Sequence, residues 1–299
     1  MVYHKPVLLK ESVEGLNIQP EGVYVDLTFG GGGHSREVLK KLGKKGRLIA
    51  FDQDPDAKAN APEDYRFKLI EANFRFLRNF LRHEGINTVQ GILADLGISS
   101  HQIDQTERGF SFRFPAVLDM RMNPGAEFTA EELLMQYSKE ELQRIFRDYG
   151  ELRNSARIAS LIVEARKDKP VTGVQWLEQI LRPVIPAQNP SKFLAKVYQS
   201  IRIEVNKELE ALREVLPQTL NYLGRGGRLV VITYHSVEDR VVKNFLKSGN
   251  LSGEVEKDFY GNVRVPWKLI NRSVITPSEE EVRINKRARS AKLRIAERQ

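Results

Sequence analysis

Cysteine is absent from the 299 residues of this chain. Disulfide bonds and zinc sites built from thiolates are therefore excluded. Enzymes that attack their substrate with a cysteine thiolate are excluded as well. That class includes the usual methylation of cytosine at carbon C5, which needs such a thiolate to activate the ring.

Long apolar runs are also missing, since the best of them, residues 229–234, has only the length of a strand. A helix that spans a bilayer needs about 20 apolar residues. Residues 1–10 lack the apolar core of a signal peptide. We therefore predict a cytoplasmic protein without membrane segments. Apolar residues make up 41% of the chain, which is enough for a full hydrophobic core.

Basic residues are concentrated near the end of the sequence. The net charge is +8, and residues 283–299 contribute +6 of it. This segment has one acid, Glu297, and seven basic residues: Arg283, Lys286, Arg287, Arg289, Lys292, Arg294 and Arg298. Charge alone leaves two interpretations open, a basic arm that binds nucleic-acid phosphates or a solvated tail.

Strand and helix patterns alternate in both end regions of the chain. Apolar, β-branched segments predict strands at 23–28, 47–51, 66–71, 89–94 and 228–234, with one or two more in 266–275, antiparallel at the sheet edge. Helices are predicted at 35–42, 74–83, 208–223 and 237–247, with Gly226 and Gly227 marking the end of the third. This alternation predicts an α/β fold with a Rossmann-like, largely parallel sheet.

The middle of the chain has almost no strand pattern. Helices are predicted there at 131–135, 139–149, 154–167, 174–181 and 190–203. Thr129 and Ser138 precede acidic residues, as N-caps do. We therefore predict that residues 104–206 form an inserted helical domain and that 1–103 and 207–299 together form the sheet domain.

Four consecutive glycines, residues 30–33, follow the first predicted strand. Such a turn lets the backbone approach a nucleotide ligand closely. The dinucleotide pattern G-x-G-x-x-G is incomplete, because Ser35 or Arg36 stands where its last glycine belongs. Asp26 suits a ligand with an amino group or a sulfonium and would repel a pyrophosphate. Asp52 follows the second strand, where a carboxylate binds the ribose of either ligand class. The pattern favours S-adenosylmethionine.

Asp95 ends a further predicted strand. Ligands of open parallel sheets bind beyond the carboxyl ends of the strands, so we expect Asp26, Asp52 and Asp95 to converge on one site. Phe74, just past the third strand, is placed to pack on an adenine, although a core position explains it better when it is taken alone. A glycine turn with a capping aspartate is the simpler alternative for the whole motif.

Matching segments along the whole chain make the sequence resemble the bacterial small-subunit ribosomal RNA cytosine-N4 methyltransferases. They include the first, His4-Lys5-Pro6-Val7-Leu8-Leu9, and Tyr234-His235-Ser236-Val237-Glu238-Asp239-Arg240. The others occur in the same order at 28–35, 52–55, 95–100, 108–112, 118–122, 202–209 and 287–294. Departures are a loose match over 189–199 and Tyr234, which stands where phenylalanine is common.

The resemblance implies a set of site residues and partners. The implied contacts to S-adenosylmethionine are Gly32, Gly33, His34, Asp52, Phe74, Asp95 and Gln102. The implied substrate is a cytidine in the decoding region of 16S ribosomal RNA, within the small ribosomal subunit. The family also tends to form homodimers. No metal site is implied.

The groups that act on the target amine are harder to predict. Many amino methyltransferases use Asp/Asn-Pro-Pro-aromatic, but here the equivalent place holds Asp95-Leu96-Gly97-Ile98. Backbone carbonyls could act as acceptors, and no general base is assigned. We predict that His235 or Asp239 positions the base and that Arg240 meets a phosphate. A helix cap at Ser236, with acids in the first turn, is an equal alternative.

RNA contacts are predicted in the helical domain and in the basic segment 283–299. The candidates in the helical domain are Arg144, Arg147, Arg153, Arg157 and Arg166. A solvated helix face is the commoner explanation of such arginines. Two other functions stay open at this point, a nicotinamide-dependent dehydrogenase and an RNA-binding assembly protein that keeps a cofactor pocket without turnover.

Overall fold

The computed structural model describes residues 6–255, 260–261 and 265–299, and the chain forms two compact units. One unit combines the chain up to Gly97 with Leu209–Gln299, and the other is Ile98–Glu208. The insertion was predicted at 104–206, so the structure places its start earlier, directly after Gly97. His4 and Lys5 of the first matching segment lie outside the described residues. Within the described part, no helix has the length and apolar character needed to cross a bilayer.

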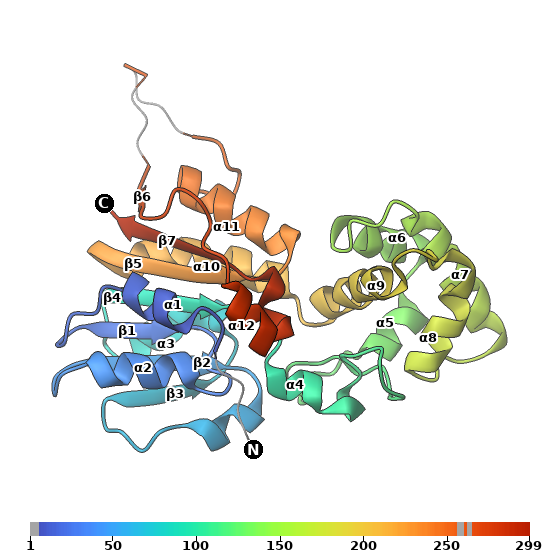
Figure 1. Cartoon of the computed structure of the whole chain (residues 1–299), viewed down its shortest axis with the longest axis horizontal. Helices are drawn as coiled ribbons and strands as arrows, with labels where there is room; N and C mark the ends of the chain where they lie inside the picture. Colours follow the sequence, from blue (N-terminus) through green and yellow to red (C-terminus); the bar gives the residue numbers. More distant parts are fainter. Residues whose placement is uncertain (1–5, 256–259, 262–264) are drawn as a thin grey trace. The chain divides into compact units, whose positions relative to one another are not determined.

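The larger unit is built on a seven-stranded sheet of order β3-β2-β1-β4-β5-β7-β6 (Figure 1). Five strands are parallel: β1 (Val23–Asp26), β2 (Arg47–Asp52), β3 (Phe67–Glu71), β4 (Val89–Asp95) and β5 (Leu223–Thr233). Two are antiparallel, β6 (Trp267–Leu269) and β7 (Lys292–Arg298). The predicted α/β class with a largely parallel sheet and an antiparallel edge is confirmed.

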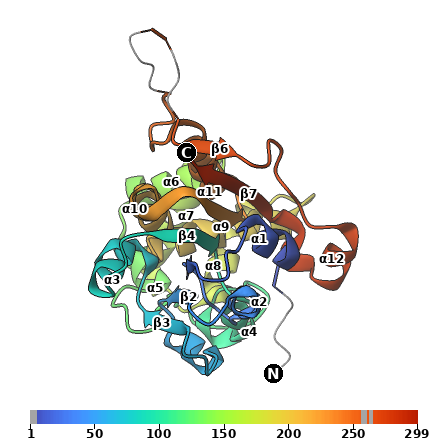
Figure 2. The ribbon, with the colours of Figure 1, turned by 90° about the vertical axis from the view of Figure 1, so that its left-hand side faces the viewer.

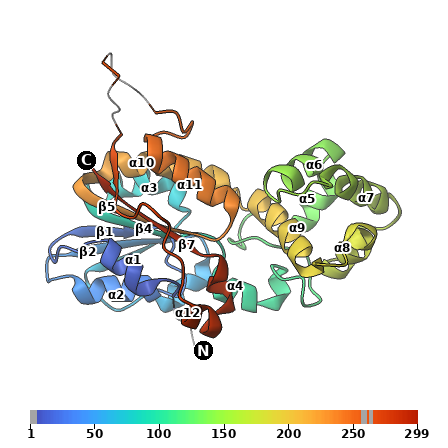
Figure 3. The same ribbon diagram turned by 45° about the horizontal axis from the view of Figure 1, so that its top comes forward.

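Helices cover both faces of this sheet (Figures 2 and 3). On one face lie α1 (Leu9–Gly15) and α2 (Gly33–Lys41), whose apolar residues share a core with β5 and β7. On the other lie α3 (Leu77–His83), α10 (Glu208–Tyr222) and α11 (Ser236–Ser248). The strands are apolar on both sides because both faces are covered.

The basic segment 283–299 is not a free tail, which corrects the sequence-based interpretation. It contains α12 (Glu279–Ile284) in part, the turn η5 (Lys286–Ser290) and β7, which lies between β5 and β6. Leu293 and Ile295 of β7 are buried against β5 and α1. The predicted start of β5 at 228 is also wrong. β5 begins at Leu223, and an irregular register near Gly91 lets Gly226 and Gly227 lie within the strand.

The second unit contains six α-helices among its described elements. They are α4 (Ser100–Asp104), α5 (Ala130–Gln136), α6 (Lys139–Asp148), α7 (Ser155–Asp168), α8 (Val174–Leu181) and α9 (Pro190–Val205). Thr129 and Ser138 form capping boxes with Glu132 and Glu141, as their spacing predicted. Fully buried Leu133, Phe146, Ile158, Leu177 and Val197 join the helices in one core.

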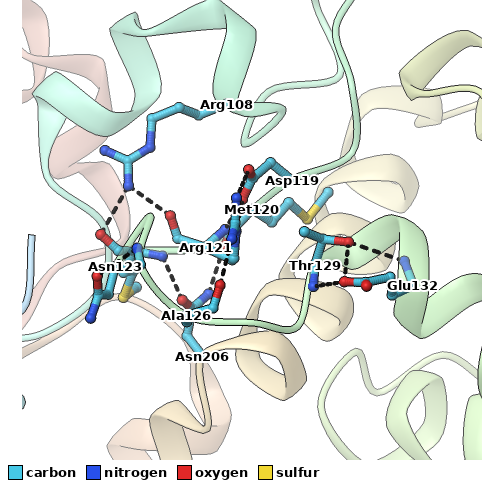
Figure 4. Close-up of polar contacts among 11 residues, drawn as sticks. Arg108, Asp119, Met120, Arg121, Asn123, Ala126, Thr129, Glu132 and Asn206 are labelled. Carbon is cyan, nitrogen blue, oxygen red and sulfur yellow. Dashed lines mark hydrogen bonds and ion pairs between the residues drawn. The ribbon is translucent and has the colours of Figure 1, made fainter.

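An irregular loop precedes α5, and polar contacts fix its path (Figure 4). The Arg108 guanidinium donates to the carbonyls of Arg121 (2.6 Å) and Met122 (2.9 Å). Asn206, at the end of α9, donates to the Met120 carbonyl (2.7 Å) and accepts from the Met122 N–H (2.6 Å). Met120 has a left-handed φ of 58°. These contacts give three of the matching segments, 108–112, 118–122 and 202–209, a structural role inside this unit.

Candidate active site

Three aspartates end three neighbouring strands of the sheet. Asp26 ends β1, Asp52 ends β2 and Asp95 ends β4, and β1 lies between the other two. Asp26 is buried, and Asp52 and Asp95 are partly buried. Their negative charges raise one another's pKa, with Asp26 acting on Asp52 and Asp95 acting on Asp26. The predicted convergence of the three carboxylates is confirmed.

Asp26 and Asp52 hold the glycine turn in place. The Ser35 hydroxyl and the Thr28 N–H donate to Asp26 at 2.7 and 3.0 Å. The Gly30 N–H donates to Oδ2 of Asp52 at 2.7 Å. Gly30 and Gly32 have φ values of 52° and 73°, which side chains with a Cβ rarely adopt. The carboxylates therefore shape the turn as well as offering charge to a ligand.

The segment around Pro6 packs directly on this turn. A Cβ at Gly33 would lie 2.0 Å from Cγ of Pro6, so only glycine fits there. Nε2 of buried His34 lies 3.1 Å from the Val7 carbonyl. Burial lowers the pKa of His34, so the neutral ring donates through Nε2 and leaves the lone pair of Nδ1 facing Asp95, 3.8 Å from Oδ2.

Asp95 receives a hydrogen bond from the Tyr234 hydroxyl, with 2.7 Å between that oxygen and Oδ1. Burial raises the pKa of Asp95 to about 7 and the pKa of Asp52 to about 6, and it also raises the pKa of Asp26. A cluster of carboxylates that oppose one another's ionisation is suited to a cationic ligand, which would relieve the repulsion. These carboxylates fit the sulfonium and amino groups of S-adenosylmethionine and disfavour a pyrophosphate.

Phe74 and Gln102 were predicted to contact the cofactor. Phe74 begins the turn η2 (Phe74–Phe76) and is partly buried. The preceding Asn73 donates to the Gln53 side chain (2.9 Å), which ties the loop after β3 to the loop after β2. Gln102 belongs to the helical unit, where it forms the capping box of α4 with Ser99. Their contacts to the cofactor stay predictions.

His235 and Asp239 have other partners in the structure. His235, rather than Ser236, is the N-cap of α11, and Glu238 completes its capping box. Asp239 accepts from the Arg294 guanidinium at 2.8 and 3.1 Å and lies 3.4 Å from Nζ of Lys292. The acids of the first turn of α11 are in place, but the predicted cap at Ser236 is wrong. Arg240 is exposed, and its phosphate contact stays a prediction.

Sequence reasoning missed three contacts of this site. They are the Tyr234 hydroxyl on Asp95, the packing of Pro6 on Gly33, and a hydrogen bond of 2.7 Å from the Leu8 N–H to Glu281. Each joins residues that are far apart in the sequence. The only signals were Tyr234 in place of the family's phenylalanine and the matching segment that contains Pro6.

Comparison with known proteins identifies the family. The model of the MraW methylase family matches residues 1–299. The chain belongs to the MraW methylase family. Curated relatives named ribosomal RNA small subunit methyltransferase H include that of Flavobacterium johnsoniae, 55% identical over 99% of this chain and 98% of its own. That of Parabacteroides distasonis is 55% identical over 99% and 97%. That of Flavobacterium psychrophilum is 56% identical over 97% and 99%.

Membership of the MraW family confirms the predicted class of enzyme, an S-adenosylmethionine-dependent methyltransferase. It also removes the dehydrogenase alternative. Among solved structures, an rRNA methylase from Streptococcus thermophilus matches 100% of this chain and 98% of its own at 13% identity, with a TM-score of 0.41.

Asp52→Ala is expected to weaken S-adenosylmethionine binding by about tenfold or more, as loss of a charged hydrogen-bond partner does. The Gly30 N–H would lose its acceptor, and so would the ribose that Asp52 is predicted to bind. Calorimetric titration at pH 8, where Asp52 is ionised, measures the change. Asp64→Ala is the control, because Asp64 pairs with Arg66 just before β3. Equal affinity in both variants would remove Asp52 from the cofactor site.

Proposed function

We propose that this MraW-family chain transfers a methyl group from S-adenosylmethionine to N4 of cytidine 1402 in 16S ribosomal RNA. The observation that carries the proposal is the set of Asp26, Asp52 and Asp95 around the glycine turn in a chain of this family. The names of the relatives support a small-subunit RNA substrate. The absence of cysteine supports a nitrogen rather than carbon C5 as the acceptor.

The main work of the protein is alignment and charge stabilisation. Bound S-adenosylmethionine supplies an already activated methyl group. The residues of the chain have to hold N4 in line with it and exclude water. The lone pair of N4 is delocalised into the ring, so acceptors on the amine are needed to make it nucleophilic and to stabilise the positive charge that develops. The segment that begins at Asp95 supplies such acceptors, from its carboxylate and from backbone carbonyls.

A target base in structured RNA has to leave its stack to reach such a site. The test is transfer of labelled methyl from S-adenosylmethionine to small ribosomal subunits and to naked 16S RNA, followed by nucleoside analysis of the product. The expected product is N4-methylcytidine. A different methylated nucleoside would indicate another amino target. Cofactor binding without transfer to either substrate would favour the assembly-protein alternative.

We also propose that exposed basic residues of both units contact phosphates. Arg144 pairs with Glu204, Arg147 pairs with Asp148, and Arg166 donates to the Leu134 carbonyl. Of the predicted arginines in the helical unit, Arg153 and Arg157 are therefore the stronger candidates, since both are exposed at the start of α7. In the basic segment 283–299, four exposed residues precede β7: Arg283, Lys286, Arg287 and Arg289.

Two double variants test these contacts, Arg153→Gln with Arg157→Gln and Lys286→Gln with Arg289→Gln. Each is expected to reduce the slope of log affinity for 16S RNA against log salt by about 1 per lost phosphate contact. Arg47→Gln is the control, because Arg47 begins β2 at the opposite ends of the strands from the carboxylates and pairs with Glu84. An unchanged slope in a double variant would remove that pair from the RNA interface. Deleting 283–299 is unsuitable, since it removes β7.

Two further parts of the proposal follow from the substrate and the family. A small-subunit RNA substrate places the enzyme in the cytoplasm. The resemblance of the sequence implies a homodimer, and sedimentation equilibrium at micromolar concentration would test it against a monomer.

A further inference from the structure

Tyr234 follows β5, next to the strand that ends in Asp95. The backbones of the two strands are paired up to Asp95 and Ile232, and the Leu96 N–H then donates to the Ile232 carbonyl at 3.0 Å. This pairing brings the Tyr234 hydroxyl to 2.7 Å from Oδ1 of Asp95. Gly97 has a φ of 100°, and a Cβ there would lie 3.7 Å from the Tyr234 ring. The ring and the carboxylate are therefore held together by the sheet itself.

The backbone of Asp95 is also held in place. Its N–H donates to the Thr28 hydroxyl at 2.7 Å, which ties Asp95 to the start of the glycine turn. Oδ2 faces Nδ1 of His34 at 3.8 Å, too long for a hydrogen bond. Oδ1 is thus oriented by the tyrosine, while Oδ2 faces the turn that was predicted to bind the cofactor.

We propose that Tyr234 is a positioning residue, whose hydroxyl orients the carboxylate of Asp95 and favours its charged form during methyl transfer. The proposal rests on the proposed function, and it goes further by assigning a role to a residue outside the predicted cofactor contacts. Tyr234 touches Asp95, and no contact of Tyr234 with substrate is needed for this role.

Several surrounding groups act on the Tyr234–Asp95 pair, and most of them oppose the ionisation of the Asp95 carboxyl. Burial raises the pKa of Asp95 to about 7, and the negative charge of Glu238 on α11 adds to the rise. Asp26 on β1 also faces Asp95. His34 on α2 is neutral, because burial lowers its pKa. Glu281 on α12 acts on both His34 and Tyr234. The Tyr234 hydroxyl opposes these effects, since its hydrogen bond lowers the pKa of Asp95.

The tyrosine itself stays protonated. Burial and the charge of Asp95 raise the pKa of Tyr234 well above its usual value, so the hydroxyl remains a donor throughout the working pH range. Removing it should therefore let the pKa of Asp95 rise further. A hydrogen bond to a charged group is of the size that shifts a pKa by about one unit.

The test is the pH profile of kcat/KM for methyl transfer in Tyr234→Phe, with Tyr222→Phe as the matched control. Tyr222 donates to the Arg78 carbonyl between α10 and α3, so its hydroxyl is structural. We expect the acidic limb of Tyr234→Phe to move up by about one pH unit, with roughly eightfold lower activity at pH 6.5 and near wild-type activity at pH 9. The profile of Tyr222→Phe should match the wild type.

Two results would overturn the inference, an acidic limb that does not move in Tyr234→Phe and an equal loss of activity at every pH. The second result would indicate a merely structural role. In that case thermal melting would show that Tyr234→Phe, like Tyr222→Phe, has a lower melting temperature than the wild type. Titration with S-adenosylmethionine from pH 6 to 9 provides a readout without turnover. As the pH is lowered, the cofactor affinity of Tyr234→Phe should begin to fall at a higher pH than the affinity of the wild type does. If the wild type methylates no RNA, the proposed function fails, but this titration still decides the role of Tyr234.

Discussion

Asp95→Asn is expected to lower the rate of methyl transfer by about 100-fold, the usual size of effect for one preorganised group that meets transition-state charge. The fold should not suffer. The amide oxygen still accepts from the Tyr234 hydroxyl, and the amide carries no charge to be buried. Methyl transfer to small subunits at pH 8 measures the loss.

The same variant should be more stable than the wild type at pH 8, by about 1 kcal/mol of unfolding free energy after allowance for partial exposure. Burial raises the pKa of Asp95 to about 7, above its unfolded value. The folded state therefore binds the proton more tightly, and the ionised carboxyl destabilises the fold above pH 7. The difference should shrink as the pH falls from 7 towards 4. A variant that loses activity and stability together would give Asp95 a mainly structural role.

Asp239→Asn is expected to lower the unfolding free energy by about 3 kcal/mol while leaving kcat per folded enzyme near the wild-type value. Asp239 and Arg294 form a two-pronged ion pair between α11 and β7, with side chains 10% and 17% exposed. The asparagine would leave this guanidinium without a full charge partner. Urea unfolding and methyl transfer on the same preparation measure both quantities.

The pH dependence of this ion pair has the opposite sign to that of Asp95. Burial alone would raise the pKa of Asp239, but Arg294 and Lys292 lower it by more, so the pKa lies below its usual value. The stabilisation is complete above about pH 4, the unfolded value, and is lost as the pH falls through the folded pKa. Asp148→Asn is the control, because its pair with Arg147 is exposed and should contribute under about 1 kcal/mol. Stable protein with lost turnover would restore the predicted role of Asp239 in positioning the base.

The sheet and its carboxylates were predictable because their signals are local. Three of the five parallel strands, β1, β2 and β4, are apolar runs that end in an aspartate, and the topology of such sheets brings these ends together. β7 was missed because its apolar residues, Leu293 and Ile295, alternate with Lys292 and Arg294. In the sequence this alternation is hidden by the density of positive charge, and the partner that makes Arg294 structural, Asp239, lies 55 residues earlier.

The hydrogen bonds of the site could not be predicted from the sequence either, because their partners are far apart in the chain. Tyr234 and Asp95 are 139 residues apart, and the entire helical unit lies between them in the chain. Gln102 matches an implied cofactor contact of the family, but its capping box with Ser99 depends on where α4 begins. Motif matching named these residues, and only the packing assigns their contacts within the protein.

The position of β7 between β5 and β6 sets the order in which a nascent chain can fold. Residues 292–298 are synthesised after the helical unit, after β5 and after α1, yet Ile295 packs on Val230 and on Gly15 of α1. Until they emerge, β5 has an open edge and α1 lacks part of its apolar partner. An open, apolar strand edge is a site of mispairing. This enzyme should therefore depend on chaperone protection late in its synthesis, after most of its sheet has formed.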